Sequence, residues 1–194
     1  MDHSLRVVRK EKMKKIRCAW CNTNNPRYVT YHDEEWGVPC FDEKYLYEML
    51  ILESFQAGLS WECILNKREN FREAFDGFKP EVILSYDEAK IEELMNNKGI
   101  IRNRRKIEAA IVNAKVFLDI QAEWGTFSKY IWHFTDGKVI YEIGKASSEL
   151  SDQISKELKK RGMKFVGITI VYAYLQAIGV IYSHDKECFM HKEE

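Results

Sequence analysis

Apolar residues return every three to four positions along most of this 194-residue chain, which is the spacing of an α-helix with one face against a core. Glycine or proline interrupts the pattern where helices usually end. Because the chain has only three prolines and few hairpin turn signals, the fold class predicted is all-α. Residues 18–43 are predicted to be irregular, and helices are expected over 44–57, from 61 onward, from about 85 to 99, around 107–117, and over 127–135, 152–161 and 168–179.

One carboxylate interrupts the apolar face of the helix expected at 44–57. At 100° per residue Glu53 falls between Leu46 and Met49, so its side chain is predicted to point inward. A buried carboxylate is costly unless it is paired or hydrogen-bonded. Two interpretations follow. Glu53 is either a core residue satisfied by a backbone amide or an arginine, or part of a functional site, where ionisable groups in apolar surroundings gather.

The stretch 85–117 predicts two helices joined by a short basic turn. Ser85 and Glu88 have the spacing of a capping box, which would start the first helix. Unpaired amides and the helix dipole favour an anion at the start of the second helix. The turn is therefore a helix-hairpin-helix candidate for binding the DNA backbone, and a purely structural helix pair is the alternative. The residues assigned to the backbone contact are Gly99, Ile101, Arg102, Arg104 and Arg105.

Charge is balanced overall but segregated along the chain. Lysine plus arginine and aspartate plus glutamate number 30 each, so net charge gives no argument for a polyanionic partner. Residues 1–17, however, carry seven basic residues against two acidic ones, and the hairpin turn and 156–164 form two further basic runs. Three such runs make DNA a reasonable partner. The domain organisation predicted is a basic, disordered tail at 1–16 and a single helical domain at 17–194.

The chain carries no apolar segment typical of a secretory signal near residue 1. Five cysteines, an odd number, argue against a disulfide framework and for a reducing compartment. Residues 165–182 are 18 positions without a charge, which is long enough for a membrane span. The glycine, threonine, tyrosine and glutamine residues among them indicate a buried core helix instead. We expect a cytoplasmic protein with no membrane partner.

Cysteine and histidine residues occur near both ends of the chain. Cys18 and His32 lie near one end, while His184 and Cys188, spaced i, i+4, are predicted to share one helical face near the other. Two cysteines and two histidines can bind zinc in a tetrahedral site and clamp the two ends together. Isolated residues of these types are more often structural, and Cys21 and His191 are further candidates. The spacing therefore leaves the ligand set open.

Aromatic residues gather near Glu53 in the sequence. Trp20, Tyr28, Tyr31 and Trp36 lie within seventeen residues, and Trp61 follows the glutamate by eight. Core packing explains most aromatic residues. In a loop beside an inward carboxylate they can instead form a box whose ring faces hold a planar or cationic ligand.

Several of these stretches, taken in order, resemble one family. They are Arg17 to Trp20, Tyr31 to Pro39, Leu52-Glu53 with Gln56 to Trp61, 67–70, 99–102 and 158–167. Together they are similar to the bacterial DNA-3-methyladenine glycosylase I family, the Tag type, and the resemblance runs from about Arg17 to Cys188.

The resemblance implies a helix-hairpin-helix DNA glycosylase fold and hydrolytic excision of 3-methyladenine from alkylated double-stranded DNA. It also implies that the catalytic aspartate of superfamily relatives is absent, and we expect a monomer. Two alternatives are a zinc-stabilised nucleic-acid-binding module without catalysis and a purely structural helical protein. By position, the resemblance implies that Glu53 is the base-contacting, catalytic glutamate. It implies a substrate pocket lined by Tyr31, Trp36 and Trp61, with Tyr28 and Trp20 nearby. It also implies a structural zinc ion bound by Cys18, His32, His184 and Cys188.

Overall fold

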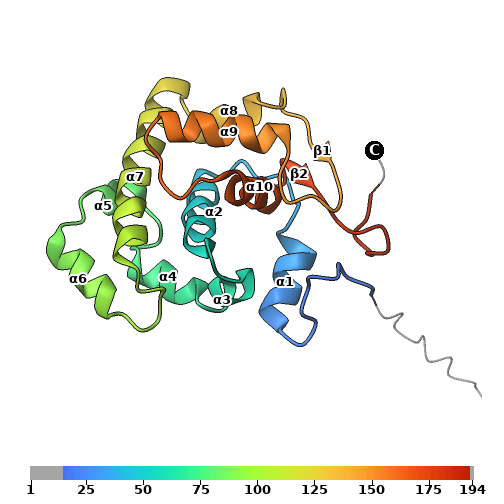
Figure 1. Cartoon of the computed structure of the whole chain (residues 1–194), viewed down its shortest axis with the longest axis horizontal. Helices are drawn as coiled ribbons and strands as arrows, with labels where there is room; N and C mark the ends of the chain where they lie inside the picture. The colour runs from blue at the N-terminus through green and yellow to red at the C-terminus, as the bar shows by residue number, and fades with distance from the viewer. Residues whose placement is uncertain (1–14, 193–194) are drawn as a thin grey trace, which may run out of the picture.

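The computed structural model describes residues 15–192, so the tail predicted at 1–16 lies almost wholly outside the described residues. Within that range the chain forms ten helices and two strands of two residues each (Figure 1), which confirms the predicted all-α class. The elements are α1 (Pro26–Glu34), α2 (Glu43–Gln56), α3 (Trp61–Asn66), α4 (Arg68–Ala74), α5 (Pro80–Leu84), α6 (Glu88–Asn96), α7 (Arg104–Trp124), α8 (Phe127–His133), β1 (Ile140–Tyr141), α9 (Glu149–Lys160), α10 (Ile168–Ala177) and β2 (Ile181–Tyr182).

Polar side chains start most of these helices. Each accepts a hydrogen bond from a first-turn backbone N–H that has no partner inside the helix. Ser60 caps α3 as predicted. The capping box predicted at Ser85 is wrong, because Asp87 caps α6 by accepting from the Lys90 N–H at 2.9 Å. The residues that cap in this way are Asn25, Asp42, Ser60, Asp87, Asn103, Thr126 and Ser148.

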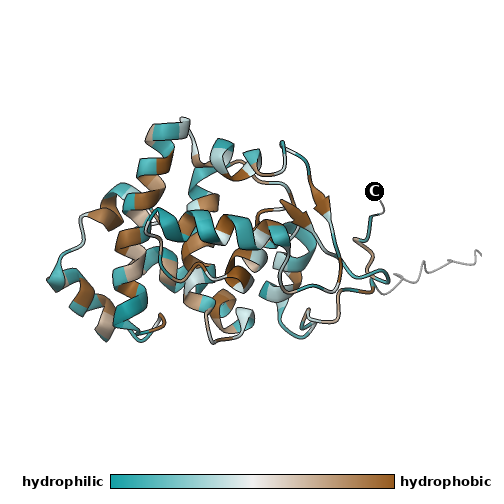
Figure 2. Ribbon diagram, turned by 45° about the horizontal axis from the view of Figure 1, so that its top comes forward, coloured by the Kyte–Doolittle hydropathy of each residue, from teal (hydrophilic) through white to brown (hydrophobic). Residues whose placement is uncertain are grey.

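Helix α2 lies at the centre of the core, where it packs against α3, α7, α8 and α10. Every residue from Leu46 to Phe55 is buried, so α2 has no solvent-facing stripe. The single apolar face predicted for this helix is therefore wrong, although Glu53 does point inward, at 3 % exposure. Most other helices show hydrophobic and hydrophilic residues alternating around their axes (Figure 2), as expected of helices with one buried side.

Helix α10 is the second central helix and packs against α2 and α9. Its residues Val171, Tyr172, Tyr174 and Leu175 are buried, which explains the uncharged run at 165–182 as core. In the part of the chain that the structure describes, no helix has the length and apolar character needed to cross a membrane.

The segment 18–43, predicted to be irregular, contains α1. Asn25 caps this helix and Pro26 occupies its start, two signals that favour a helix as well as a turn. The loop after α1 then packs closely on the end of α10, where the Gly37 N–H donates to the Gln176 carbonyl at 2.9 Å. Only glycine fits at Gly179, because a Cβ there would lie 2.2 Å from the Val38 carbonyl carbon.

The two ends of the described chain meet beside α1. The N–H of Phe189 donates to the Ile16 carbonyl at 2.8 Å, and β1 pairs in parallel with β2. His184 and Cys188 lie in the turns that follow β2, so the shared helical face predicted for them is wrong. They nevertheless approach residues 18 and 32, as the metal hypothesis requires.

Candidate functional site

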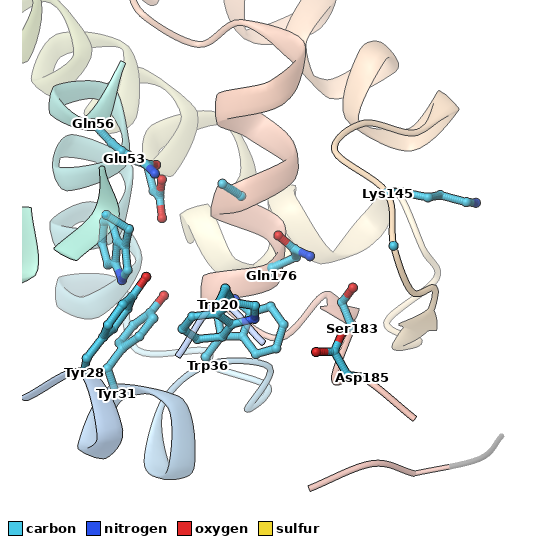
Figure 3. A pocket seen from close by; sticks show the side chains of 13 residues that line it. Trp20, Tyr28, Tyr31, Trp36, Glu53, Gln56, Lys145, Gln176, Ser183 and Asp185 are labelled. Carbon is cyan, nitrogen blue, oxygen red and sulfur yellow. The ribbon is translucent and has the colours of Figure 1, made fainter. Parts of the chain in front are cut away.

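A cavity of about 310 Å³ opens between α1, the end of α2, the start of α3 and α10 (Figure 3). All six residues that the sequence assigned to a ligand pocket line it, although four of them come from the segment predicted to be irregular. Residues that the sequence analysis missed complete the wall. The lining consists of Trp20, Tyr28, Tyr31, Trp36, Glu53, Gln56, Trp61, Gly144, Lys145, Ala173, Gln176, Ser183 and Asp185.

Glu53 is a buried carboxyl group without a partner. Its side chain is 3 % exposed, and Oε2 has no hydrogen-bond partner among the described residues. Burial in these surroundings raises the pKa of Glu53 to about 8. The interpretation of Glu53 as a core residue held by an arginine or a backbone amide is therefore wrong.

Glu48, five residues earlier on α2, is a buried glutamate that does have hydrogen-bond partners. It is 4 % exposed, and its Oε1 accepts from Arg68 Nε at 2.6 Å and from Arg72 Nε at 2.8 Å. Arg68 in turn donates to Glu35 at 2.7 Å. This network was not predicted from the sequence, because its members lie on three separate elements.

Two further polar atoms of the pocket wall are buried and have no hydrogen-bond partner within residues 15–192. They are Oε1 of Gln56 and Nε1 of Trp61. With Glu53 Oε2 they are two hydrogen-bond acceptors and one donor on residues that line the pocket. Gln56 was missed by the sequence analysis, although its position one helical turn after Glu53 was the available signal.

Aromatic rings from the segment at residue 20, from α1 and the turn after it, and from α3 form much of the pocket wall. The ring centroids of Tyr31 and Trp61 are 5.2 Å apart, and Trp20 meets Trp36 edge-on at 4.7 Å. Burial raises the pKa of Tyr28 to about 12, so its phenol is neutral at pH 7. Neutral rings around an unpaired carboxyl group suit a flat ligand that carries positive charge.

The far side of the pocket is polar and was not predicted. Gln176 from α10, with Ser183 and Asp185 from the segment after β2, faces the aromatic rings there (Figure 3). Asp185 Oδ2 accepts from the Ala19 N–H at 2.8 Å, which ties this side to the segment that carries Trp20. The metal site predicted on Cys18 and His184 would bring these two segments together, so it was the available signal for Asp185.

The metal candidates form one buried cluster next to the pocket. Their donor atoms all lie within 4.8 Å of one another. Cys18 Sγ is 3.4 Å from His184 Nδ1, and Cys188 Sγ is 3.5 Å from both His32 Nε2 and His184 Nδ1. A tetrahedral ion with bonds of about 2.0 Å to nitrogen and about 2.3 Å to sulfur separates its ligands by about 3.6 Å. The four residues therefore have the spacing of a metal site.

The surroundings of the cluster also suit a metal. Burial lowers the pKa of His184 to about 4, which keeps its imidazole neutral as a ligand requires. Backbone N–H groups point at both sulfur atoms, from Asp185 to Cys18 at 3.3 Å and from Met190 to Cys188 at 3.4 Å. At Cys18 this bond partly offsets burial, which raises the pKa of the thiol to about 12. The two rival candidates face other partners, Cys21 the Tyr28 carbonyl and His191 the His184 carbonyl.

The predicted hairpin connects α6 to α7 through residues 97–103. Gly99 packs so closely on Asn70 that a Cβ would lie 3.1 Å from that side chain. Arg102 and Arg105 are exposed and have no ion-pair partner among the described residues. Arg104 differs, because its guanidinium pairs with Glu88, with Glu92 and with Glu108. Its charge is thus largely compensated inside the protein.

Comparison with known proteins places these features in one family. A family model described as methyladenine glycosylase matches residues 20–191. The chain is 44 % identical to DNA-3-methyladenine glycosylase 1 of Escherichia coli (strain K12), with 89 % of this chain and 95 % of that protein covered. It is 41 % identical to DNA-3-methyladenine glycosylase of Haemophilus influenzae, with 89 % and 96 % covered.

Solved structures agree with this result. A crystal structure of 3-methyladenine DNA glycosylase I (TAG) superposes with a TM-score of 0.87 at 43 % identity, covering 91 % of this chain and all of that one. A structure of the Staphylococcus aureus enzyme, concerned with 3-methyladenine recognition, gives a TM-score of 0.87 at 36 % identity, covering 92 % and 97 %. The similarity spans the pocket, the hairpin and the helical core.

Proposed function

Because this chain belongs to the methyladenine glycosylase family, we propose that it excises 3-methyladenine from alkylated double-stranded DNA by hydrolysing the N-glycosidic bond. The observation that carries the proposal is the unpaired carboxyl group of Glu53, buried among aromatic rings in an open cavity. A protein that only bound the DNA backbone would have no use for such a group. A protein whose aromatic residues served folding alone would not leave the cavity open.

The chemistry of the lesion explains why recognition can carry most of the reaction. Methylation at N3 gives adenine a positive charge and weakens the glycosidic bond, so the base is already a good leaving group. The nucleotide must leave the helix to reach the enzyme, and this costs a few kcal/mol, less for a damaged base. The pocket then has to hold the cationic base while water attacks the sugar carbon.

The pocket atoms match the edge of adenine. Glu53 Oε2 and Gln56 Oε1 are acceptors for the two protons of the exocyclic amine, and Trp61 Nε1 is a donor for a ring nitrogen. Ring faces of Tyr31 and Trp36 enclose the base. Guanine carries a carbonyl oxygen where adenine carries the amine, so two acceptors at this position would repel it. Glu53 thus serves recognition and offsets the charge of the base.

Zinc is the metal that the Cys/His cluster suits best. Two thiolates and two imidazoles in tetrahedral arrangement are typical of closed structural zinc sites. The cluster joins the segment at residue 18 and α1 to the segment after β2, so the ion would stabilise the fold where the two ends of the described chain meet. The ligands in this proposal are Cys18, His32, His184 and Cys188.

The hairpin between α6 and α7 is the proposed contact with the DNA backbone. Gly99 and Ile101 form its turn, and Arg102 and Arg105 supply exposed positive charge at the start of α7. Arg104 pairs with Glu88 and Glu92 of α6 and so ties the start of α7 to α6. We further propose that residues 17–194 form one domain that acts as a monomer in the cytoplasm.

Chromatography of the free bases released from methylated DNA tests the proposal. The purified protein is expected to release 3-methyladenine and little 7-methylguanine, and Glu53→Gln is expected to impair release far more than it weakens binding to undamaged duplex. No release by folded, zinc-loaded protein would overturn the proposal and favour a DNA-binding module, whose affinity would then be measured against salt concentration.

A further inference from the structure

We propose that Arg17 and Asp33 form an outer shell around the Cys/His cluster, and that this shell positions the aromatic wall of the pocket. The inference rests on the proposed function for the identity of the ligand, the free base 3-methyladenine. It assigns a role to two residues that lie directly beside the metal candidates Cys18 and His32 but donate no ligand atom.

The contacts of the pair are short and directional. Arg17 Nε donates to Asp33 Oδ1 at 2.8 Å, and Arg17 Nη2 donates to Asp33 Oδ2 at 2.6 Å, so the guanidinium binds both carboxylate oxygens. Oδ1 also lies 2.8 Å from His32 Nδ1. The side chains of Arg17 and Asp33 are only 17 % and 15 % exposed, and that of His32 is fully buried.

This arrangement determines which nitrogen of His32 faces the cluster. Nδ1 donates its proton to the carboxylate, so Nε2 carries the lone pair. Nε2 accepts from the Cys18 backbone N–H at 3.3 Å and lies 3.5 Å from Cys188 Sγ. A carboxylate behind a ligating histidine also raises the electron density of the ring. Arg17 keeps the carboxylate in place, because a bidentate ion pair fixes both its distance and its plane.

The cluster is in turn connected to the pocket wall. Tyr31 precedes the ligand His32 in α1, and the ring of Trp20 lies 5.2 Å from that of His32. The second histidine, His184, contacts the Trp36 carbonyl through Nε2 at 3.2 Å. Three rings of the wall therefore take their positions from ligand residues, whereas Glu53 and Trp61 belong to α2 and α3.

The competing explanation of the Arg17–Asp33 ion pair is that it only fixes residue 17 to α1 and stabilises the fold. It predicts that loss of the ion pair lowers stability without a selective effect on metal or base binding. The chain contains a matched control, because Arg161 also makes a bidentate pair, with Glu123, at 2.6 Å and 3.1 Å. Glu123→Gln breaks that pair on a part of the surface that lines neither the pocket nor the cluster.

The experiment compares full-length, zinc-loaded wild type, Asp33→Asn, Arg17→Gln and Glu123→Gln. Zinc transfer to a chromogenic chelator measures how tightly each protein binds zinc. Quenching of tryptophan fluorescence by free 3-methyladenine measures the affinity of the pocket for the base. We expect Asp33→Asn to weaken zinc binding about 10- to 100-fold and Arg17→Gln to weaken it less, with Glu123→Gln at the wild-type value. Base affinity in Asp33→Asn should fall as zinc is lost and return when zinc is added back.

Zinc transfer from Asp33→Asn and Arg17→Gln at the wild-type rate would overturn the outer-shell role. Undiminished base affinity in Asp33→Asn after zinc loss, with helical content retained by circular dichroism, would overturn the link to the pocket. If Asp33→Asn fails to fold, Arg17→Gln decides both points, since it keeps the contact between Asp33 and His32. Wild-type protein that holds zinc but does not bind the base would refute the proposed function instead, and the chelator measurement would still test the shell.

Discussion

Replacing Glu53 with glutamine is expected to stabilise the protein at alkaline pH and to leave its stability almost unchanged near pH 5. Burial raises the pKa of Glu53 from 4.5 to about 8, so between these values the folded protein keeps a proton that the unfolded chain has lost. The free energy of unfolding therefore falls as pH rises through this window. One pKa unit is worth about 1.4 kcal/mol, which makes the loss about 3 kcal/mol at pH 7 and about 5 kcal/mol well above pH 8.

Urea unfolding of wild type and Glu53→Gln at several pH values between 5 and 9 measures this effect. Glutamine has the size of protonated glutamate but does not ionise, so the gap between the two proteins should grow from under about 1 kcal/mol near pH 5 to about 5 kcal/mol near pH 9. Glu48→Gln is the control on the same helix. Because it breaks a buried ion pair with Arg68 and Arg72, it should destabilise the protein by about 3 kcal/mol. A gap for Glu53→Gln that is constant with pH would refute the reasoning.

The same carboxyl group should determine how the reaction depends on pH. A cationic base is held best by the ionised form, so kcat/KM for 3-methyladenine release should rise with pH, reach half its maximum near the Glu53 pKa of about 8, and level off above it. Initial rates on methylated DNA between pH 6 and 9, corrected for spontaneous release, give the profile. Glu53→Gln should show a low and flat profile, and a wild-type profile that is flat through pH 8 would exclude Glu53 as the titrating group.

Four other substitutions test the remaining parts of the site. Cys188→Ser should lower zinc content and thermal stability together, because a closed site contributes to folding; a full zinc complement would point to a different ligand. Gln56→Leu should reduce 3-methyladenine release about 10-fold, as expected for one lost hydrogen bond, and lower the ratio of 3-methyladenine to 3-methylguanine released; an unchanged ratio would remove Gln56 from base selection. Arg102→Ala should weaken binding to duplex and reduce the salt slope by about one unit, whereas Arg104→Ala, whose charge is already paired, should reduce thermal stability with little change in slope. Equal slopes for both variants would contradict the assignment.

The helical fold was predictable because local signals agreed with the final packing. The cap at Ser60, the glycine at 99 and the apolar spacing around Ile107 all give the right elements. The errors arise where two local signals compete. Asparagine followed by Pro26 is both a turn signal and a helix start, and tertiary packing of Tyr28 and Tyr31 decides in favour of α1. In the same way, Asp87 takes the cap predicted for Ser85.

The site was predictable where its residues carry a chemical anomaly in the sequence itself. An inward glutamate and closely spaced aromatic residues can be recognised in the sequence, and the structure brings them into one pocket. Gln176, Ser183 and Asp185 show no such anomaly, because Gln176 reaches the pocket from α10 and the other two reach it only when the segment after β2 packs beside α1. The choice of Cys18 over Cys21 likewise depends on which sulfur faces the histidines in the fold.

Glu48 and Glu53 show why the unpaired carboxyl group indicates a ligand rather than a defect of folding. Both lie on α2 and are equally buried, at 4 % and 3 % exposure. Among the residues that the structure describes, two arginines pair with Glu48, and no side chain pairs with Glu53 Oε2. An internal partner would stabilise the protein, but it would also occupy the acceptor that a cationic base needs. The protein therefore loses stability at Glu53 and gains affinity for a positively charged base. A variant that gives this carboxyl group a partner should be more stable and should bind the base more weakly.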